Sequence, residues 1–335
     1  MTRSGTGRDQ RSVGARRVID NRAGHGPDSL WPEASATFVV TPLIQELVDR
    51  AVAYLEAGYP IDFSGPAGTG KTTLALHVAA KLGRPVTLIH GDDEFGSSDL
   101  VGNDTGYRKN RLVDNYVHSV LKEEETVRTL WVDNRLTTAC RYGHTLVYDE
   151  FTRSRPEANN VLLSVLGEGI LSLPKLRYVG EGYLQVDPGF RAIFTSNPDE
   201  YAGIHSSQDA LRDRLISIHV GHYDRDTEVA ITAARSSVST PAAERVVDLV
   251  RHFRQQGVQG HRPSIRAAIM IARVVALQGA SFDPANGVFQ RTCRDVLGLD
   301  CVKPGTLDQP RSAELILEQF GQTCDALEAA LHDSH

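Results

Sequence analysis

Apolar residues between residues 37 and 222 recur in two patterns that alternate along the chain. Helical spacing predicts helices at residues 42–57, 71–82 and 156–168. Short apolar runs predict strands at residues 59–64, 85–90, 144–149, 190–196 and 215–220. Because strands that alternate with helices usually form a parallel sheet covered on both faces, we expect an α/β core at residues 37–222.

The two flanks of this core have different patterns. Residues 1–36 are rich in Arg, Gly and Ser and lack apolar periodicity, which predicts a disordered basic tail. Beyond residue 222 the apolar spacing is helical, and we expect a helical domain at residues 223–335. Its predicted helices are residues 226–234, 241–256, 264–277, 284–297 and 312–331.

Two β-rich stretches interrupt the alternation within the core. Residues 116–121 and 127–132 flank the polar run Lys122–Glu125, which predicts a hairpin with its turn at that run. A second hairpin is predicted to join residues 170–173 to 183–186 through a turn that contains Gly.

Composition and charge argue against several classes of protein. The 335 residues include 36 Lys and Arg against 42 Asp and Glu, a net charge of −6 that argues against a general nucleic-acid binder. Six Arg and three Asp fall within the first 30 residues, so the basic character is confined to the start of the chain. No run approaches the roughly 18 apolar residues of a membrane span, and the N-terminus lacks the apolar centre of a signal peptide. The four cysteines have no CxxC spacing, so we expect reduced structural thiols in the cytoplasm.

Residues 65–72 read GPAGTGKT, which fits the GxxxxGK[ST] pattern of a phosphate-binding loop. Glycines let backbone N–H groups turn toward phosphate, and the helix that follows adds the positive end of its dipole. We expect Lys71 to contact the β- and γ-phosphates of a nucleotide and Thr72 to bind Mg²⁺. The residues predicted to bind the nucleotide are Gly65, Pro66, Ala67, Gly68, Thr69, Gly70, Lys71, Thr72 and Thr73.

An acidic pair, Asp149 and Glu150, ends the apolar run that begins at His144. Such a pair is by itself most often only a strand end, but this one lies about 80 residues beyond a phosphate-binding loop, where its carboxylates can meet metal and water. We expect Asp149 to hold Mg²⁺ and Glu150 to polarise the water that attacks the γ-phosphate.

Further polar candidates come later in the chain. Asn197 follows the strand predicted at residues 190–196, where its amide could hold the same water or contact the γ-phosphate. Taken alone, an Asn-Pro turn explains this residue better, but its place after the other two motifs favours a role in the site. Arg212 and Arg214 precede the last strand, and Arg266 begins a helix of the C-terminal domain. Because guanidinium groups bind phosphate in bidentate fashion, each of these arginines is a candidate γ-phosphate sensor.

Together these motifs resemble the AAA+ ATPases of the MoxR-like branch. The resemblance rests on GPAGTGKT, LVYDE, FTSNP, DALRDRL and the SIRA of the C-terminal domain, and it covers roughly residues 38–300. It implies a five-stranded parallel sheet flanked by helices, with the strand of the phosphate-binding loop in its middle, and a small helical lid. It also implies a hairpin insertion before the Asp-Glu strand, which fits the stretch near 116–132.

The resemblance assigns roles to the candidate residues. Asn197 corresponds to the sensor-1 residue and Arg266 to the sensor-2 residue of the lid. Arg214 would be an arginine finger that reaches the nucleotide of a neighbouring subunit, with Arg212 as the other candidate. The implied cofactors are ATP and Mg²⁺, and the implied assembly is a homo-oligomeric ring, a hexamer in this family, with catalysis by Glu150 and Lys71.

Within this branch, the sequence around the motifs resembles that of the gas vesicle ATPases. The resemblance rests on WVDNRLT, LVYDEFTRSRPEANN and TSNPDEYAG. It implies a cytoplasmic ATPase that drives remodelling or assembly of gas vesicle shell or accessory proteins and that can associate with the vesicles. The hairpin near 116–132 is the part expected to transmit motion to such a client.

Three other functions fit parts of this pattern. A general MoxR-type chaperone would mature a metalloenzyme, and a nucleotide-dependent scaffold would bind ATP with little hydrolysis. DNA remodelling is disfavoured by the acidic charge of the chain beyond its first 30 residues. The intact set of catalytic positions favours an enzyme over a scaffold.

Overall fold

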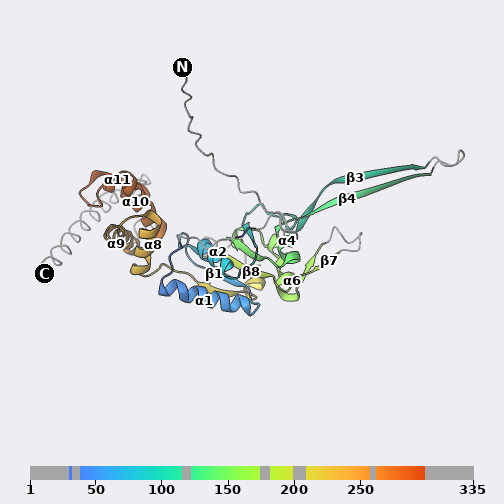
Figure 1. The fold of residues 1–335 in the computed structure, drawn as a ribbon, viewed down its shortest axis with the longest axis horizontal. Coiled ribbons are helices and arrows are strands. Elements are labelled where there is room, and N and C mark those ends of the chain that lie inside the picture. The colour runs from blue at the N-terminus through green and yellow to red at the C-terminus, as the bar shows by residue number, and fades with distance from the viewer. Residues whose placement is uncertain are drawn as a thin grey trace, which may run out of the picture.

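The computed structural model describes residues 30–31, 38–114, 122–173, 182–198, 209–256 and 262–298. Figure 1 shows a core built on a twisted sheet, a group of helices at one end and a long two-stranded ribbon at the other. The core therefore lies between the helices and the ribbon in space, although the ribbon is inserted within the core in the sequence.

A five-stranded parallel sheet forms the centre of the core, as predicted. Its strands are β1 (Ile61–Ser64), β2 (Val86–His90), β5 (Thr145–Asp149), β8 (Arg191–Ser196) and β9 (Ile216–His219), in the order β2-β5-β8-β1-β9. The expectation that β1 lies in the middle was wrong, because β5 and β8 both insert between β1 and β2 while only β9 lies on the other side. β8 therefore lies between β1, which leads into the phosphate-binding loop, and β5, which ends at Asp149, and Asn197 directly follows β8.

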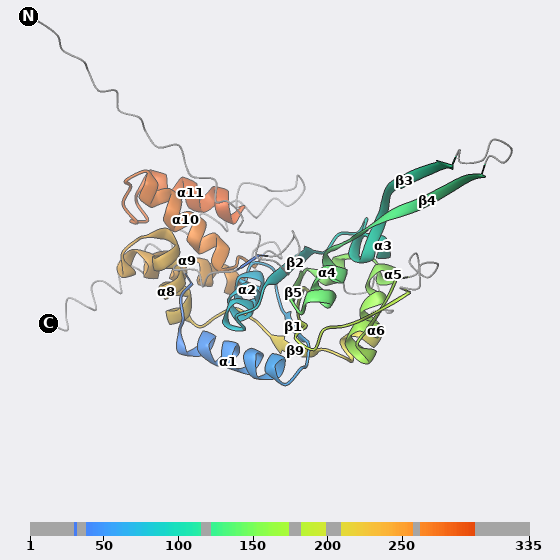
Figure 2. The ribbon, with the colours of Figure 1, turned by 45° about the vertical axis from the view of Figure 1, so that its right-hand side comes forward.

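Two hairpins extend from this core. The longer one pairs β3 (Gly102–Asp114) with β4 (Lys122–Asp133), and Figures 1 and 2 show it projecting away from the sheet. The turn predicted at Lys122–Glu125 was wrong, because these residues belong to β4, and the strand predicted at residues 116–121 lies outside the described residues. In the backbone register Lys122 is paired with Asp114 and Glu125 with Arg111, so these residues belong to the ladder and not to its turn. The shorter hairpin, β6 (Ile170–Ser172) with β7 (Tyr183–Gln185), confirms the strand pairing of the second prediction, while its predicted turn lies outside the described residues.

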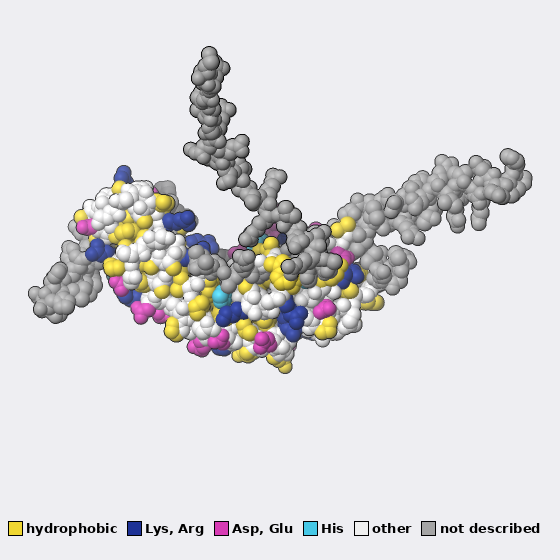
Figure 3. All heavy atoms as spheres, in the orientation of Figure 1, with side chains coloured by type: hydrophobic (Ala, Val, Ile, Leu, Met, Phe, Trp, Pro, Cys, Tyr) yellow, Lys and Arg dark blue, Asp and Glu magenta, His cyan; other side chains and the backbone are white. Residues whose placement is uncertain are grey.

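The start of the chain contacts the edge of the sheet at one point. Leu30 forms an isolated antiparallel bridge with Val86 of β2, in which each backbone N–H donates to the other residue's carbonyl at 2.8 Å. The rest of the tail predicted at residues 1–36 lies outside the described residues, apart from Trp31. Both signs of charge are interspersed over the face seen in Figure 3. Among the described helices, none has the length and hydropathy that crossing a bilayer requires.

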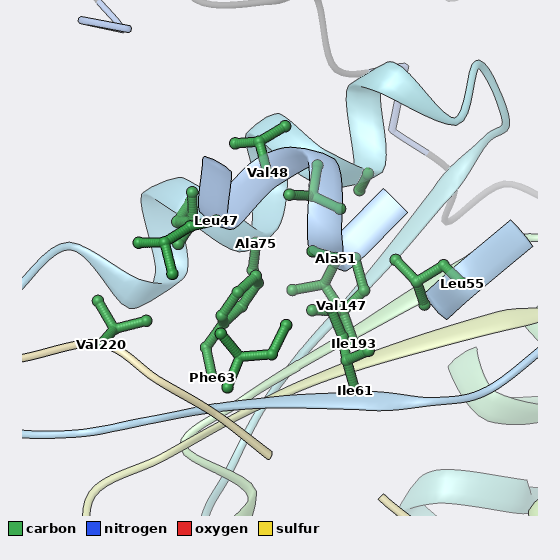
Figure 4. Close-up of a cluster of buried hydrophobic side chains, with 14 of the residues drawn as sticks. Leu47, Val48, Ala51, Leu55, Ile61, Phe63, Ala75, Val147, Ile193 and Val220 are labelled. Atoms are coloured by element: carbon green, nitrogen blue, oxygen red, sulfur yellow. The ribbon is translucent and has the colours of Figure 1, made fainter. Parts of the chain in front are cut away.

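Helices cover both faces of the sheet. On one face α1 (Pro42–Glu56) and α2 (Lys71–Lys81) pack on apolar residues of alternating strand positions, such as Phe63, Val147 and Ile193, all fully buried (Figure 4). The opposite face is covered by α3 (Ser97–Val101), α4 (Arg135–Tyr142), η1 (Phe151–Arg153), α5 (Pro156–Asn159), α6 (Val161–Glu168) and α7 (Asp209–Arg212). Each large apolar side chain buried in these layers contributes about 1.5–3 kcal/mol. The helix predicted at residues 156–168 is thus two helices.

The C-terminal helices have their own core. They are α8 (Arg225–Ser236), α9 (Thr240–Gln256), α10 (Ile265–Leu277) and α11 (Gly287–Leu297), which surround buried residues such as Val247, Ile271 and Phe289. Residue 222, where we expect the domain boundary, lies in the connection between β9 and α8. The helix predicted at residues 312–331 lies outside the described residues. We call α8–α11 the lid.

Candidate nucleotide-binding site

The phosphate-binding loop connects β1 to α2 and is enclosed by two other segments. A side chain on Gly65 would overlap the carbonyl oxygen of Val220, which follows β9. Gly68 has a φ of +76°, and a side chain there would overlap the hydroxyl of Ser264 from the lid. Both positions therefore require glycine, and the loop lies directly against the lid.

Lys71 is the first residue of α2 and is buried in the loop. Its Nζ donates to the carbonyl oxygens of Gly65 at 2.8 Å and Pro66 at 2.7 Å. The ammonium group therefore lies inside the curve of the loop, beside the N-terminus of α2, where an anion gains from both the charge and the helix dipole.

Asp149, at the end of β5, accepts hydrogen bonds from two hydroxyl groups. Thr72 Oγ1 donates to Asp149 Oδ1 at 2.6 Å, and Thr195 Oγ1 donates to the same oxygen at 2.7 Å. His90, which is opposite Asp149 in the register of β2 and β5, places Nδ1 3.4 Å from Oδ2. The structure thus brings together Thr72 and Asp149, the two residues predicted to bind metal.

The donor set of this cluster fits Mg²⁺. A hydroxyl and a carboxylate are the hard oxygen ligands that Mg²⁺ prefers, with phosphates and water in its other positions. Within the described ranges, no group of three or more His, Cys, Asp or Glu side chains gathers to hold a metal by itself. Thr72 and Asp149 would therefore share the ion with a bound nucleotide.

Glu150 follows Asp149 in a left-handed backbone conformation, with a φ of 52°. Its N–H donates to Thr195 Oγ1 at 2.8 Å, which holds this turn against β8. Its carboxylate is half exposed and accepts a hydrogen bond from Arg153 Nη1 at 3.0 Å. A left-handed conformation at a non-glycine residue costs on the order of 1–3 kcal/mol and is common at functional sites.

Asn197 is buried at the end of β8, between the ends of β5 and β1. The preceding residue, Ser196, donates its hydroxyl to Asp62 Oδ2 of β1 at 2.8 Å. Burial raises the pKa of the Asp62 carboxyl to about 6, against the opposing effects of the Ser196 hydrogen bond and the Arg212 charge. The strand that carries Asn197 is therefore tied to the strand that leads into the phosphate-binding loop.

The three candidate arginines lie in different surroundings. Arg266, in the first turn of α10, lines a cavity that also touches Gly68. Arg214 donates from Nη1 to the carbonyl oxygen of Ala210 at 2.6 Å and is not among the residues that line this cavity. Arg212 ends α7, and its charge acts on Asp62. Only Arg266 of the three is brought to the phosphate-binding loop within this chain.

The cavity has a volume of about 280 Å³ and lies between the loop, the start of α1 and the lid. Its apolar lining comes from Phe38, Val39, Ile44, Leu74, Tyr223, Ile231, Ile265, Ile269 and Met270. Two basic residues, Arg235 and Arg266, complete it together with Gly68–Gly70 and Thr73. An apolar cavity next to an anion-binding loop can hold a molecule with a flat ring at one end and phosphate at the other.

Three polar residues of the site were not predicted from the sequence: His90, Thr195 and Asp62. His90 is the last residue of β2, and Thr195 lies two positions before Asn197. The position of His90 and Thr195 near the carboxyl ends of predicted strands could have identified them, because the carboxyl ends of parallel strands meet at one edge of the sheet.

Comparison with known proteins agrees with this geometry. The AAA domain of the dynein-related subfamily matches residues 63–215. The gas vesicle ATPase GvpN of Ancylobacter aquaticus is 53% identical over 271 residues, which cover 81% of this chain and 76% of that protein. The gas vesicle ATPase GvpN1 of Halobacterium salinarum is 40% identical over 308 residues, 92% of this chain and 85% of that protein.

Solved structures show the same fold at low sequence identity. The crystal structure of NtrX from Brucella abortus has a TM-score of 0.51 and 17% identity, and the match covers 85% of this chain and 62% of that one. At this identity the likeness speaks for the fold alone. The sequence identities, the matched AAA domain and the described site together show that this chain is an ATP hydrolase and belongs to the GvpN family of AAA+ gas vesicle ATPases.

Proposed function

We propose that ATP binds with its phosphates in the loop at Gly65–Thr73 and its adenine in the adjoining cavity. The single observation that carries this proposal is the convergence of Lys71, Thr72 and Asp149 at one edge of the sheet, beside the loop whose Gly68–Gly70 line a cavity together with Arg266 of the lid. Mg²⁺ bound by Thr72 and Asp149 would supply positive charge beside the β- and γ-phosphates.

In the proposed reaction, Glu150 orients a water molecule and takes its proton as the water oxygen bonds to the γ-phosphorus. The bond from that phosphorus to the oxygen of ADP breaks, and inorganic phosphate and ADP leave. Asn197 helps to orient the water, while Lys71 and Arg266 stabilise the charge on the phosphate oxygens. The half-exposed position of the Glu150 carboxylate supports this role, because water reaches it directly.

The complete site requires a second subunit in this proposal. Arg214 lies away from the cavity of its own chain, which supports a role as the arginine finger of a neighbour's site, with Arg212 as the alternative. We therefore propose a homo-oligomeric ring, a hexamer, in which each interface holds one nucleotide.

The proposed work of this ring is assembly of gas vesicles in the cytoplasm. The names of the relatives, gas vesicle ATPases in two organisms, support this assignment. The client would be a gas vesicle shell or accessory protein, and nucleic acid and membrane are not expected as partners. The projecting β3–β4 hairpin is suited to transmit motion between lid and core to such a client.

The test combines vesicle formation with ATP turnover. Cells that depend on this protein for gas vesicles would carry the natural chain, Lys71→Ala, Glu150→Gln, or the control Lys81→Ala, which removes an exposed lysine from the other end of α2. We expect Lys71→Ala and Glu150→Gln to lose both turnover and vesicles, and Lys81→Ala to keep both. Normal vesicle yield with Glu150→Gln would show that hydrolysis does not drive assembly, and a nucleotide-dependent scaffold would replace this proposal.

A further inference from the structure

A buried carboxylate in the lid, Glu228, has no role in the chemistry described so far. It lies in α8 and its side chain is 2% exposed. Arg251 Nη1 donates to Glu228 Oε2 at 3.1 Å, and Arg254 Nη1 donates to Glu228 Oε1 at 2.8 Å. One carboxylate thus holds two guanidinium groups of α9, one on each oxygen.

The same two guanidinium groups also bind backbone carbonyls outside α8 and α9. Arg251 Nη1 donates to the carbonyl oxygen of Tyr223 at 3.0 Å. Arg254 Nε donates to the carbonyl oxygen of Pro263 at 2.7 Å. The three charged side chains therefore join the connection between β9 and α8 to the segment that leads into α10.

Both of these backbone segments end at the nucleotide cavity. Tyr223 lines the cavity itself. Pro263 is followed by Ser264, whose hydroxyl lies against Gly68 of the phosphate-binding loop, and then by the first turn of α10 with Arg266. A shift of either carbonyl would move a wall of the cavity.

We infer that Glu228 is a positioning residue that, through Arg251 and Arg254, sets the distance between Tyr223 and Arg266 across the nucleotide cavity. This inference rests on the proposed role of Arg266 at the phosphates. Ion pairs on a protein surface rarely fix geometry, but a fully buried carboxylate with two hydrogen-bonded guanidinium partners has one favourable arrangement.

The lowered pKa of His222 agrees with a cluster of positive charges around Arg251 and Arg254. Burial, together with the charges of Arg254, Arg251 and Arg262, lowers the pKa of His222 to about 4. The imidazole therefore stays neutral at pH 7 and adds no further positive charge beside the two arginines.

The test is the effect of Glu228→Gln on kcat/KM for ATP, measured alone and together with Arg266→Ala. We expect Glu228→Gln to lower kcat/KM about tenfold, since small misplacements of binding groups have effects of this size or larger. In the Arg266→Ala background the same change should alter kcat/KM by less than about threefold, because Glu228 acts through Arg266. Equal losses in the two backgrounds would overturn the inference.

A matched control separates positioning from lid stability. Asp248 receives two hydrogen bonds from Arg225, at 2.7 and 2.8 Å, and so joins the same pair of helices on the exposed side. Asp248→Asn should keep kcat/KM within about twofold of the natural chain. A loss as large as that of Glu228→Gln would show that any weakening of the lid has this effect, and the inference would fail.

Arg254→Lys decides the question if Glu228→Gln does not unfold cooperatively. Lysine keeps the charge beside Glu228 but cannot also bind the Pro263 carbonyl through a second nitrogen of a planar group. We expect kcat/KM to fall about tenfold with little change in the unfolding temperature, and an unchanged kcat/KM would overturn the inference. Lys71→Ala separates failure of the proposed function from failure of this inference. If Lys71→Ala binds ATP with the natural affinity, the proposed function fails. If Lys71→Ala loses ATP affinity while Glu228→Gln keeps its kcat/KM, only the positioning role of Glu228 is refuted.

Discussion

Thr195 connects the two acidic residues of the site, and its replacement by valine gives a quantitative test. Its side chain is 1% exposed, so valine fills the same space without a hydroxyl. The change removes the charge-assisted bond to Asp149 (2.7 Å) and the bond from the Glu150 N–H (2.8 Å). With about 2 kcal/mol for the first bond and about 1 kcal/mol for the second, we expect a loss of about 3 kcal/mol in the free energy of unfolding.

The assay is thermal unfolding followed by circular dichroism, with ATP turnover measured on the same samples. A loss of about 3 kcal/mol corresponds to a decrease of about 6–12 °C in Tm for a domain of this size. Turnover should fall about tenfold or more, because Asp149 loses the group that orients it. Thr195→Ser is the control, since it keeps the hydroxyl and loses one methyl, at a cost of about 1 kcal/mol. If Thr195→Val is as stable and as active as Thr195→Ser, the reasoning is refuted.

Three further predictions concern the loop, the sheet and the subunit interface. Gly68→Ala should weaken ATP binding at least tenfold, because its side chain would overlap the lid, whereas Gly58→Ala, with a φ of +89° and open space around it, should lose only about 1 kcal/mol of stability and keep binding. Burial raises the pKa of Asp62 from 3.8 to about 6, so the natural chain loses free energy of unfolding as the pH rises from about 4 through 6. Asp62→Asn lacks this loss. In urea unfolding its free energy of unfolding should therefore rise by about 3 kcal/mol relative to the natural chain between pH 4 and pH 7. Arg214→Ala should lower turnover about 10³-fold, and mixing it with Glu150→Gln should restore part of the activity, because some interfaces then combine an intact Glu150 with an intact Arg214.

Each of these three has a result that would contradict it. Equal ATP affinity of Gly68→Ala and Gly58→Ala would show that the lid does not lie against the loop in the working protein. The difference in free energy of unfolding between Asp62→Asn and the natural chain could instead be constant from pH 4 to pH 7. That result would contradict the raised pKa of Asp62. Mixed subunits that stay inactive would place the finger elsewhere, and Arg212→Ala would then be the variant to mix.

Much of the site could be predicted because it depends on short, contiguous motifs. Lys71 and Thr72 follow from the loop, and Asp149, Glu150 and Asn197 from the ends of apolar strands. The structure brings Thr72 and Asp149 together, as this pattern requires. In such a fold the carboxyl ends of the strands meet at one edge, so linear order is enough to bring the motifs together.

Contacts between distant segments could not be predicted in this way. Glu228 meets Arg251 and Arg254 only because α8 packs on α9, and nothing distinguishes these two arginines from the many others in the sequence. Asp62 has the same difficulty, since its partner Ser196 is 134 residues away. A single sequence states which residues carry charge, but strand order and helix packing decide which charges meet.

The long hairpin shows a second reason for error. Residues 122–125 are four charged residues in a row, a composition typical of a turn, yet they form part of β4. These two strands form a sheet of their own, and residues 122–125 lack the alternation of apolar and polar positions that marks a half-buried strand. α4 was also missed, because it spans only 8 residues. It lies between Asn134 and Gly143, two residue types that are common at helix ends.

The most direct test of the central claim is to measure ATP binding and steady-state phosphate release side by side for the natural chain and Glu150→Gln. We predict that the variant binds ATP within about threefold of the natural affinity, because Glu150 lies outside the loop and the cavity. Its phosphate release should fall at least about 100-fold, the usual contribution of a general base. Phosphate release near the natural rate in a variant that binds ATP normally would contradict the assignment of Glu150, and with it the account of how this site hydrolyses ATP.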